Sequence, residues 1–66
     1  MSEFLPHQQR VVDEKRELDE KIGKLGPFLT SAIFKNLDGD EQERLCDQYE
    51  VMQVYSNILR DRIAAF

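Results

Sequence analysis

The chain has 66 residues, with 9 Lys plus Arg against 13 Asp plus Glu, which gives a formal net charge of −4. This length holds one domain at most and excludes a two-domain enzyme. The acidic balance argues against a protein that coats nucleic-acid polymers, because such proteins bind phosphates with many Lys and Arg side chains. A small anionic ligand needs only a few convergent cations, so this class of ligand is not excluded.

A chain this short needs a supplement to its core, since a core below about 70 residues supplies only about 3–5 kcal/mol. Disulfides cannot supply it, because Cys46 is the only cysteine. The sequence contains neither a CxxC nor an HxxxH spacing, the patterns that are typical of metal sites. We therefore expect neither a metal nor a cofactor. Association with further copies of the chain is the remaining stabiliser, so the sequence predicts a homo-oligomer.

The sequence also predicts a cytoplasmic protein. It begins at Met1 without a charged-then-apolar leader, and one unpaired thiol is typical of a reducing compartment. No apolar run approaches the roughly 18 residues that cross a bilayer, so we expect no membrane partner.

A first helix is predicted over about residues 6–25. On its outer face, Glu17 with Lys21 and Glu20 with Lys24 have the spacing of ion pairs four residues apart. Apolar residues recur at helical steps and form one stripe: Val11, Leu18, Ile22, Leu25 and Leu29.

Gly26–Pro27 interrupts this pattern, because proline lacks an N–H and crowds the preceding turn. We therefore expect a stop or a kink, followed by a connector over about residues 26–39 that contains a short helical turn near residues 32–35. Its apolar residues are expected to close one end of the core and not to face solvent: Phe28, Leu29, Ile33, Phe34 and Leu37.

A second helix is predicted over about residues 40–65, because Asp40 and Glu43 have the spacing of a capping box. One apolar seam is expected to face the first helix: Leu45, Tyr49, Met52, Ser56, Leu59, Ile63 and Phe66. A second apolar flank carries more surface than one partner helix covers: Val51, Val54, Tyr55 and Ile58. The fold class is thus all-α, an antiparallel helical hairpin with a short connecting turn that assembles with copies of itself.

Catalytic signals are weak. His7 could serve as a base, as a ligand contact or as a solvated residue of the first turn. A single histidine does not define a catalytic site, which needs several residues in a fixed arrangement. Cys46 follows the core position Leu45 and is interpreted as a small packing residue, because no histidine is near in sequence to lower its pKa. The acidic run 38–43 lacks the glycine that a calcium loop requires at its sixth position and is interpreted as a helix cap. The sequence therefore predicts a protein that is not an enzyme.

Cations near the helix ends could instead hold an anion, although on a monomer they would be ordinary solvated charges. In a two-fold oligomer each cation would appear twice, which suits a ligand with two phosphates. The available residues are Arg10, Lys21, Lys24, Arg60 and Arg62.

Three segments make the chain recognisable: QQRVVDEKRELDEKIGKL over residues 8–25, DEQERL over residues 40–45 and MQVYSNILRDRIAAF over residues 52–66. This pattern resembles the helical-hairpin domain of phage-encoded anti-defence sponges, which is shared by anti-CBASS protein two and the first Thoeris anti-defence protein. The resemblance implies a protein that holds cyclic dinucleotide signals of bacterial immunity intact between protomers of a compact hexamer. Some members also hold cyclic trinucleotides at separate sites.

The resemblance further implies which residues contact the ligand. Lys24 matches the phosphate-contacting lysine, and Gln9 falls where relatives can present an aromatic ring to the base, so that this amide or His7 would make the contact. Gly26 replaces a threonine that relatives often have, which removes a hydroxyl donor from the position of the trinucleotide site. Arg62 is the candidate for the arginine of that second site.

Two other functions compete with such a sponge in the cytoplasm of an infected bacterium. One is an oligomeric helical module that docks another protein through its extra apolar flank, and it would show no stabilisation by nucleotides. The other is a regulator that binds nucleic acid, which would show a steep salt dependence that the acidic composition does not predict.

Overall fold

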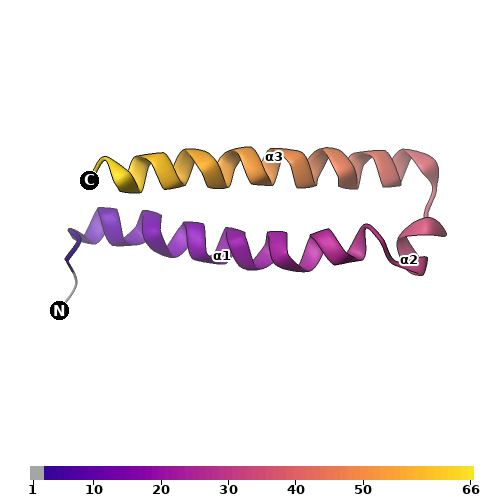
Figure 1. The fold of residues 1–66 in the computed structure, drawn as a ribbon, viewed down its shortest axis with the longest axis horizontal. Coiled ribbons are helices and arrows are strands. Elements are labelled where there is room, and N and C mark those ends of the chain that lie inside the picture. The colour runs from indigo at the N-terminus through magenta and orange to yellow at the C-terminus, as the bar shows by residue number, and fades with distance from the viewer. Residues whose placement is uncertain (1–2) are drawn as a thin grey trace.

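Three helices follow one another in the computed structural model, which describes residues 3–66. Helix α1 covers Pro6–Phe28, α2 covers Ala32–Lys35 and α3 covers Gly39–Ala64. As Figure 1 shows, α1 and α3 lie side by side and antiparallel, with α2 at one end and the start of α1 beside the end of α3 at the other. The predicted all-α hairpin is confirmed, and it is a rod of 47 × 19 × 13 Å.

The first helix begins with Pro6, whose missing N–H needs no partner at this position. The side chain of Gln8 accepts a hydrogen bond from the N–H of Leu5 at 2.9 Å, which satisfies one further donor at this end. At the other end the helix does not stop at Gly26–Pro27 but continues to Phe28. Proline there removes only one hydrogen bond in the last turn, and the next N–H groups still find carbonyl partners within that turn.

Polar side chains of the connector and of the first turn of α3 hold the connector in place. Ser31 caps α2, because its Oγ accepts from the N–H of Phe34 at 3.1 Å. The side-chain amide of Gln42 donates to the carbonyl oxygen of Leu37 at 2.9 Å and thereby fixes the start of α3. The expectation that the apolar residues here avoid solvent was wrong for Ile33, which is 67% exposed because the short α2 has no second layer above it.

The cap of α3 differs from the predicted one. Its N-cap residue is Asp38 and not Asp40, and the Asp38 side chain makes no capping hydrogen bond. Asp40 lies in the first turn together with Glu41, where the helix dipole favours negative charge. The capping-box interpretation of Asp40 and Glu43 was therefore wrong, although the acidic start of the helix is physically favourable.

The core lies between α1 and α3, in the half of the hairpin where α1 begins and α3 ends. Val11, Leu18 and Leu59 are its buried apolar residues, with Ser56 as the buried polar one among residues 3–66. Partly buried side chains complete the cluster: Ile22, Met52 and Ile63. A core with few buried apolar side chains contributes little free energy of folding.

An apolar surface lies outside this core on α3. We name it the α3 stripe and define it as Val51, Val54, Tyr55 and Ile58, whose exposed fractions run from 39% to 66%. Within α1, by contrast, no large hydrophobic residue is exposed. In the part of the chain that the structure describes, no helix has the length and hydrophobicity to cross a membrane.

Candidate functional site

The polar centre of the hairpin is the Asp19 carboxylate, which joins the two long helices. It accepts a hydrogen bond from Lys15 Nζ at 2.6 Å on its own helix and from Ser56 Oγ at 2.5 Å on α3. The hydrogen bond from Lys15, followed by that from Ser56, lowers the pKa of the Asp19 carboxyl below its ordinary value, against a smaller opposing effect of burial. Sequence reasoning missed this contact; the available signal was a serine in the apolar seam of the second helix, which needs a partner when buried.

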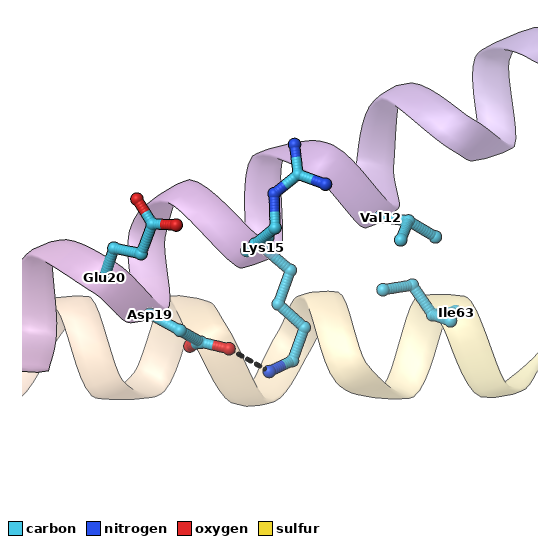
Figure 2. A pocket seen from close by; sticks show the side chains of 6 residues that line it. Val12, Lys15, Asp19, Glu20 and Ile63 are labelled. Carbon is cyan, nitrogen blue, oxygen red and sulfur yellow. Dashed lines mark hydrogen bonds and ion pairs between the residues drawn. The ribbon is translucent and has the colours of Figure 1, made fainter.

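A groove of about 480 Å³ opens on one side of this centre (Figure 2). Val12 of α1 and Ile63 of α3 face each other at one end, and the Lys15 side chain reaches to Asp19 in the middle. The groove is lined by Val12, Lys15, Arg16, Asp19, Glu20 and Ile63. Because its two cations stand beside two acids, and neither histidine nor cysteine is present, this groove offers no nucleophile with a base and no net charge for an anion.

A second groove of about 420 Å³ lies against the same carboxylate. Its side chains are mostly hydrogen-bonding groups: Asp19, Ile22, Gln53, Ser56 and Asn57. Side-chain amides of this kind can pair with the edges of nucleobases, whereas the ionised Asp19 disfavours a phosphate group beside it. Neither groove includes a residue that sequence reasoning had selected as a ligand contact.

The sequence-predicted site residues lie in two separate places. His7, Gln9 and Arg10 are in the first turns of α1, at the same end of the hairpin as Arg62 near the end of α3. Lys24 and Gly26 lie near α2 at the other end. Fourteen residues separate Arg10 from Lys24, about 21 Å along a helix. One chain therefore does not bring the predicted contacts into a single site.

At the open end of the hairpin, three of these side chains are solvent-exposed: His7, Arg10 and Arg62. Gln9 is partly buried, and its amide donates to Asp13 Oδ1 at 3.0 Å. Neither arginine has an ion-pair partner within residues 3–66, so both guanidinium groups are available to an anion.

At the loop end, Lys24 is exposed and Gly26 is partly buried. A Cβ atom at Gly26 would lie 3.1 Å from the hydroxyl oxygen of Tyr49 on α3. This glycine therefore lets the two helices approach closely, which is a packing role distinct from any ligand contact.

The predicted ion pairs of Glu17 with Lys21 and of Glu20 with Lys24 were wrong. The ion pairs on this helix join Lys15 to Asp19 at 2.6 Å and Arg16 to Asp13 at 3.4 Å. Exposed pairs of this kind are worth little, so the side chains can choose other rotamers at little cost. As a result, the two lysines remain uncompensated among the described residues.

Among residues 3–66 no group of three or more His, Cys, Asp or Glu side chains is placed to hold a metal ion. Cys46 is exposed and forms no disulfide, so its interpretation as a packing residue was wrong. What the arrangement offers is a set of exposed cations at both ends of a rod.

Comparisons with known proteins place the chain in a family. The family model described as Sequestin matches residues 5–65. The chain is 42% identical over 63 residues to a 7.5 kDa protein from the denB-rIIB intergenic region of Enterobacteria phage T4, and the match covers 96% of this chain and 98% of the phage protein. No solved structure matches. The chain therefore belongs to the Sequestin family and has a small phage protein among its relatives.

Proposed function

We propose that this protein is a non-enzymatic sponge, which binds cyclic oligonucleotide signals of bacterial immunity and withholds them from their effector. The observation that carries this proposal is its membership of the Sequestin family, whose name denotes sequestration, together with the phage relative. The target would be a defence system such as CBASS, and the ligand a cyclic dinucleotide or a cyclic trinucleotide. The protein would act in the cytoplasm of the infected host.

The charges of the hairpin support an anionic ligand. Lys24, Arg10 and Arg62 are exposed cations without ion-pair partners among the described residues. A phosphate group bound to such a cation gains a charge-assisted hydrogen bond. Lys24 is the proposed phosphate contact, while His7 or Gln9 would lie against a base.

Self-association is part of the proposal, because the candidate contacts are split between the two ends of one chain. A complete site then needs residues from more than one copy, and ligand binding would stabilise the assembly by mass action. A hexamer is the proposed assembly. Gly26 supplies no hydroxyl, so we propose that cyclic dinucleotides bind more tightly than trinucleotides.

Calorimetric titration of the purified protein with a panel of cyclic di- and trinucleotides tests this function. We expect saturable binding to at least one member, with unaltered ligand recovered after the protein is denatured. An enzyme would return hydrolysed product instead. Failure to bind any member of a broad panel would remove the proposal.

The exposed α3 stripe favours a second candidate function, an oligomeric module that docks another protein. Thermal unfolding separates the two candidates, because a sponge gains stability in proportion to the logarithm of the nucleotide concentration. A docking module would keep the same melting temperature at every nucleotide concentration.

A further inference from the structure

The apolar residues between the two long helices repeat at an interval that does not define how far one helix is shifted along the other. On α3, Leu45, Met52 and Leu59 follow one another at intervals of seven residues. On α1, Val11 and Leu18 have the same interval. Sliding one helix past the other by seven residues, about 10 Å, would therefore bring apolar rows together again. Apolar packing alone does not select the observed register.

The connector is also compatible with such a slip. A turn that moved along the chain by three or four residues would shorten one helix, lengthen the other and change their register by seven residues. A turn that began at Gly26–Pro27 would suit this move, because proline disfavours the helix at that point. Some other feature of the chain must exclude the slipped registers.

The hydrogen bond between the helices is lost in a slipped register. Ser56 is a buried polar residue, 9% exposed, and its Oγ donates to Asp19 Oδ1 at 2.5 Å. Lys15 donates to Oδ2 at 2.6 Å, so each carboxylate oxygen has its own donor (Figure 2). After a slip of seven residues Ser56 would be level with Val12 or with Gly26, whose side chains accept no hydrogen bond. A buried hydroxyl group without a partner is costly.

A second contact depends on side-chain size. Tyr49 of α3 lies against Gly26 of α1, where a Cβ atom would be 3.1 Å from the tyrosine hydroxyl oxygen. Gly26 follows Asp19 by seven residues and Tyr49 precedes Ser56 by seven, so both contacts belong to the same antiparallel register. In one slipped register Tyr49 would meet the side chain of Asp19 instead of a glycine. In the other it would lie beyond the last residue of α1.

We propose that these two contacts, Ser56 with Asp19 and Tyr49 with Gly26, select the register of the hairpin, and that their four residues thereby position the candidate ligand contacts. The best attested use of a buried polar group is to fix the register of packed helices. Here a size match one heptad away reinforces the polar contact. The proposal concerns the fold of one chain, so it depends neither on the ligand nor on the number of copies that assemble.

The register determines how two candidate cations are arranged at the open end of the hairpin. Because Asp19 faces Ser56, residue 13 is level with Arg62, and Arg10 is three residues from that level, about 4.5 Å along the helix axis. A slip of seven residues changes this offset by about 10 Å in either direction. The two guanidinium groups would then present a different arrangement to an anion.

The distance between two spin labels tests the register in solution. The labels are attached to Glu17→Cys and Glu43→Cys, at exposed positions of α1 and α3, in a chain whose Cys46 is replaced by serine. Glu17 is level with residue 58, so the labels are about 22 Å apart along the axis. An excess of unlabelled chain keeps distances between copies out of the measurement. We expect pulsed electron paramagnetic resonance to give one distance in this reference protein.

The combined variant Ser56→Ala with Gly26→Gln removes both contacts. We expect a second distance that differs from the reference by about 10 Å, the length of a seven-residue slip. Far-UV circular dichroism checks that the variant stays helical. A single distance at the reference value overturns the proposal. If the combined variant loses its helical signal, Ser56→Ala alone decides by the same two outcomes, because alanine fills nearly the same space without a hydroxyl group.

Two control variants leave the register contacts in place. Gly23→Gln adds the same side chain three residues earlier, where a Cβ atom would have nothing within 4 Å. Asp19→Asn keeps an oxygen acceptor for Ser56. Both should show the reference distance alone, and a second distance in either one would contradict the proposal, since neither removes a register contact. No nucleotide is present, so the result does not bear on the proposed ligand.

Discussion

Leu59 and Ile58 are adjacent on α3 and have isomeric side chains, yet the chain uses them differently. Leu59 points toward α1 and is 0% exposed, whereas Ile58 is 51% exposed on the α3 stripe. The inner face of α3 thus provides the core of the hairpin, and the outer face carries apolar surface of the same chemical kind. The difference teaches that this helix has two apolar faces but only one partner within its own chain.

The outer faces of α1 and α3 also differ in polarity. The outer positions of α1 are charged, as in a helix that meets water on one side. Those of α3 include the four apolar residues of the α3 stripe, which extends over about two turns. The self-association proposed above would cover this stripe, and the predictions below separate the two faces by experiment.

Leu59→Ala should have the largest effect. The side chain is 0% exposed, and truncating a buried leucine costs about 2–5 kcal/mol because apolar contacts are lost and a cavity remains. We expect the urea midpoint of unfolding to fall at every protein concentration. The matched control is Ile58→Ala, which should leave the hairpin intact and weaken only the concentration dependence. Equal effects of the two variants would show that both faces are buried to the same degree within one chain.

Tyr55→Asp should dissociate the assembly. An unpaired carboxylate in an apolar seam costs several kcal/mol, so the dissociation constant should rise at least about 100-fold. Native mass spectrometry would report the copy number and any retained ligand together. Nucleotide binding should be lost along with assembly. A variant that stays assembled and binds normally would mean that the α3 stripe is not an interface.

Lys24→Ala should weaken cyclic dinucleotide binding by about 1.5–3 kcal/mol, the range of a lost charge-assisted hydrogen bond. Assembly should not change, because Lys24 is exposed and is not part of the α3 stripe. Lys35→Ala removes another exposed cation, in α2, and serves as the control in the same titration. If both variants keep full affinity, the phosphate site lies elsewhere.

Asp19→Asn should have the smallest effect, about 1 kcal/mol, because the carboxylate is partly exposed and its ion pair is screened. The fold lowers the pKa of Asp19 below its ordinary value of 3.8 through the hydrogen bonds from Lys15 and Ser56. Its stabilising contribution is therefore present above that value and is lost as the pH falls through the lowered pKa.

Urea denaturation between pH 6 and about pH 2 should show the wild type losing its advantage over Asp19→Asn in the acid range. An advantage that stays constant down to the lowest pH would mean that the charge of Asp19 plays no part in joining the helices.

The secondary structure was largely predictable, because a helical period is a local property. Apolar steps of three and four residues predicted both long helices, and the expected helical turn near residues 32–35 corresponds to α2. The end of α1 and the cap of α3 were less accurate. A proline in a last turn removes a single hydrogen bond, and Asp38 and Asp40 are both chemically suited to begin a helix.

The candidate site was less predictable than the fold. Sequence reasoning selected Lys24 and Arg62 as ligand contacts, and the predicted antiparallel hairpin already implied that they lie at different ends of one chain. Sequence reasoning missed the bond from Ser56 to Asp19, which spans 37 positions in the sequence. Such contacts depend on the axial register of the two helices, which no local sequence pattern determines.

The sequence by itself determined that this chain forms two amphipathic helices joined by a short turn, since backbone hydrogen bonding and side-chain period act over a few residues. Only the tertiary structure decided the register of the two helices, which places Ser56 of α3 against Asp19 of α1. In this register Leu18, Ser56 and Leu59 are buried while the α3 stripe remains outside. Packing between distant segments selects one register from several that the pattern allows.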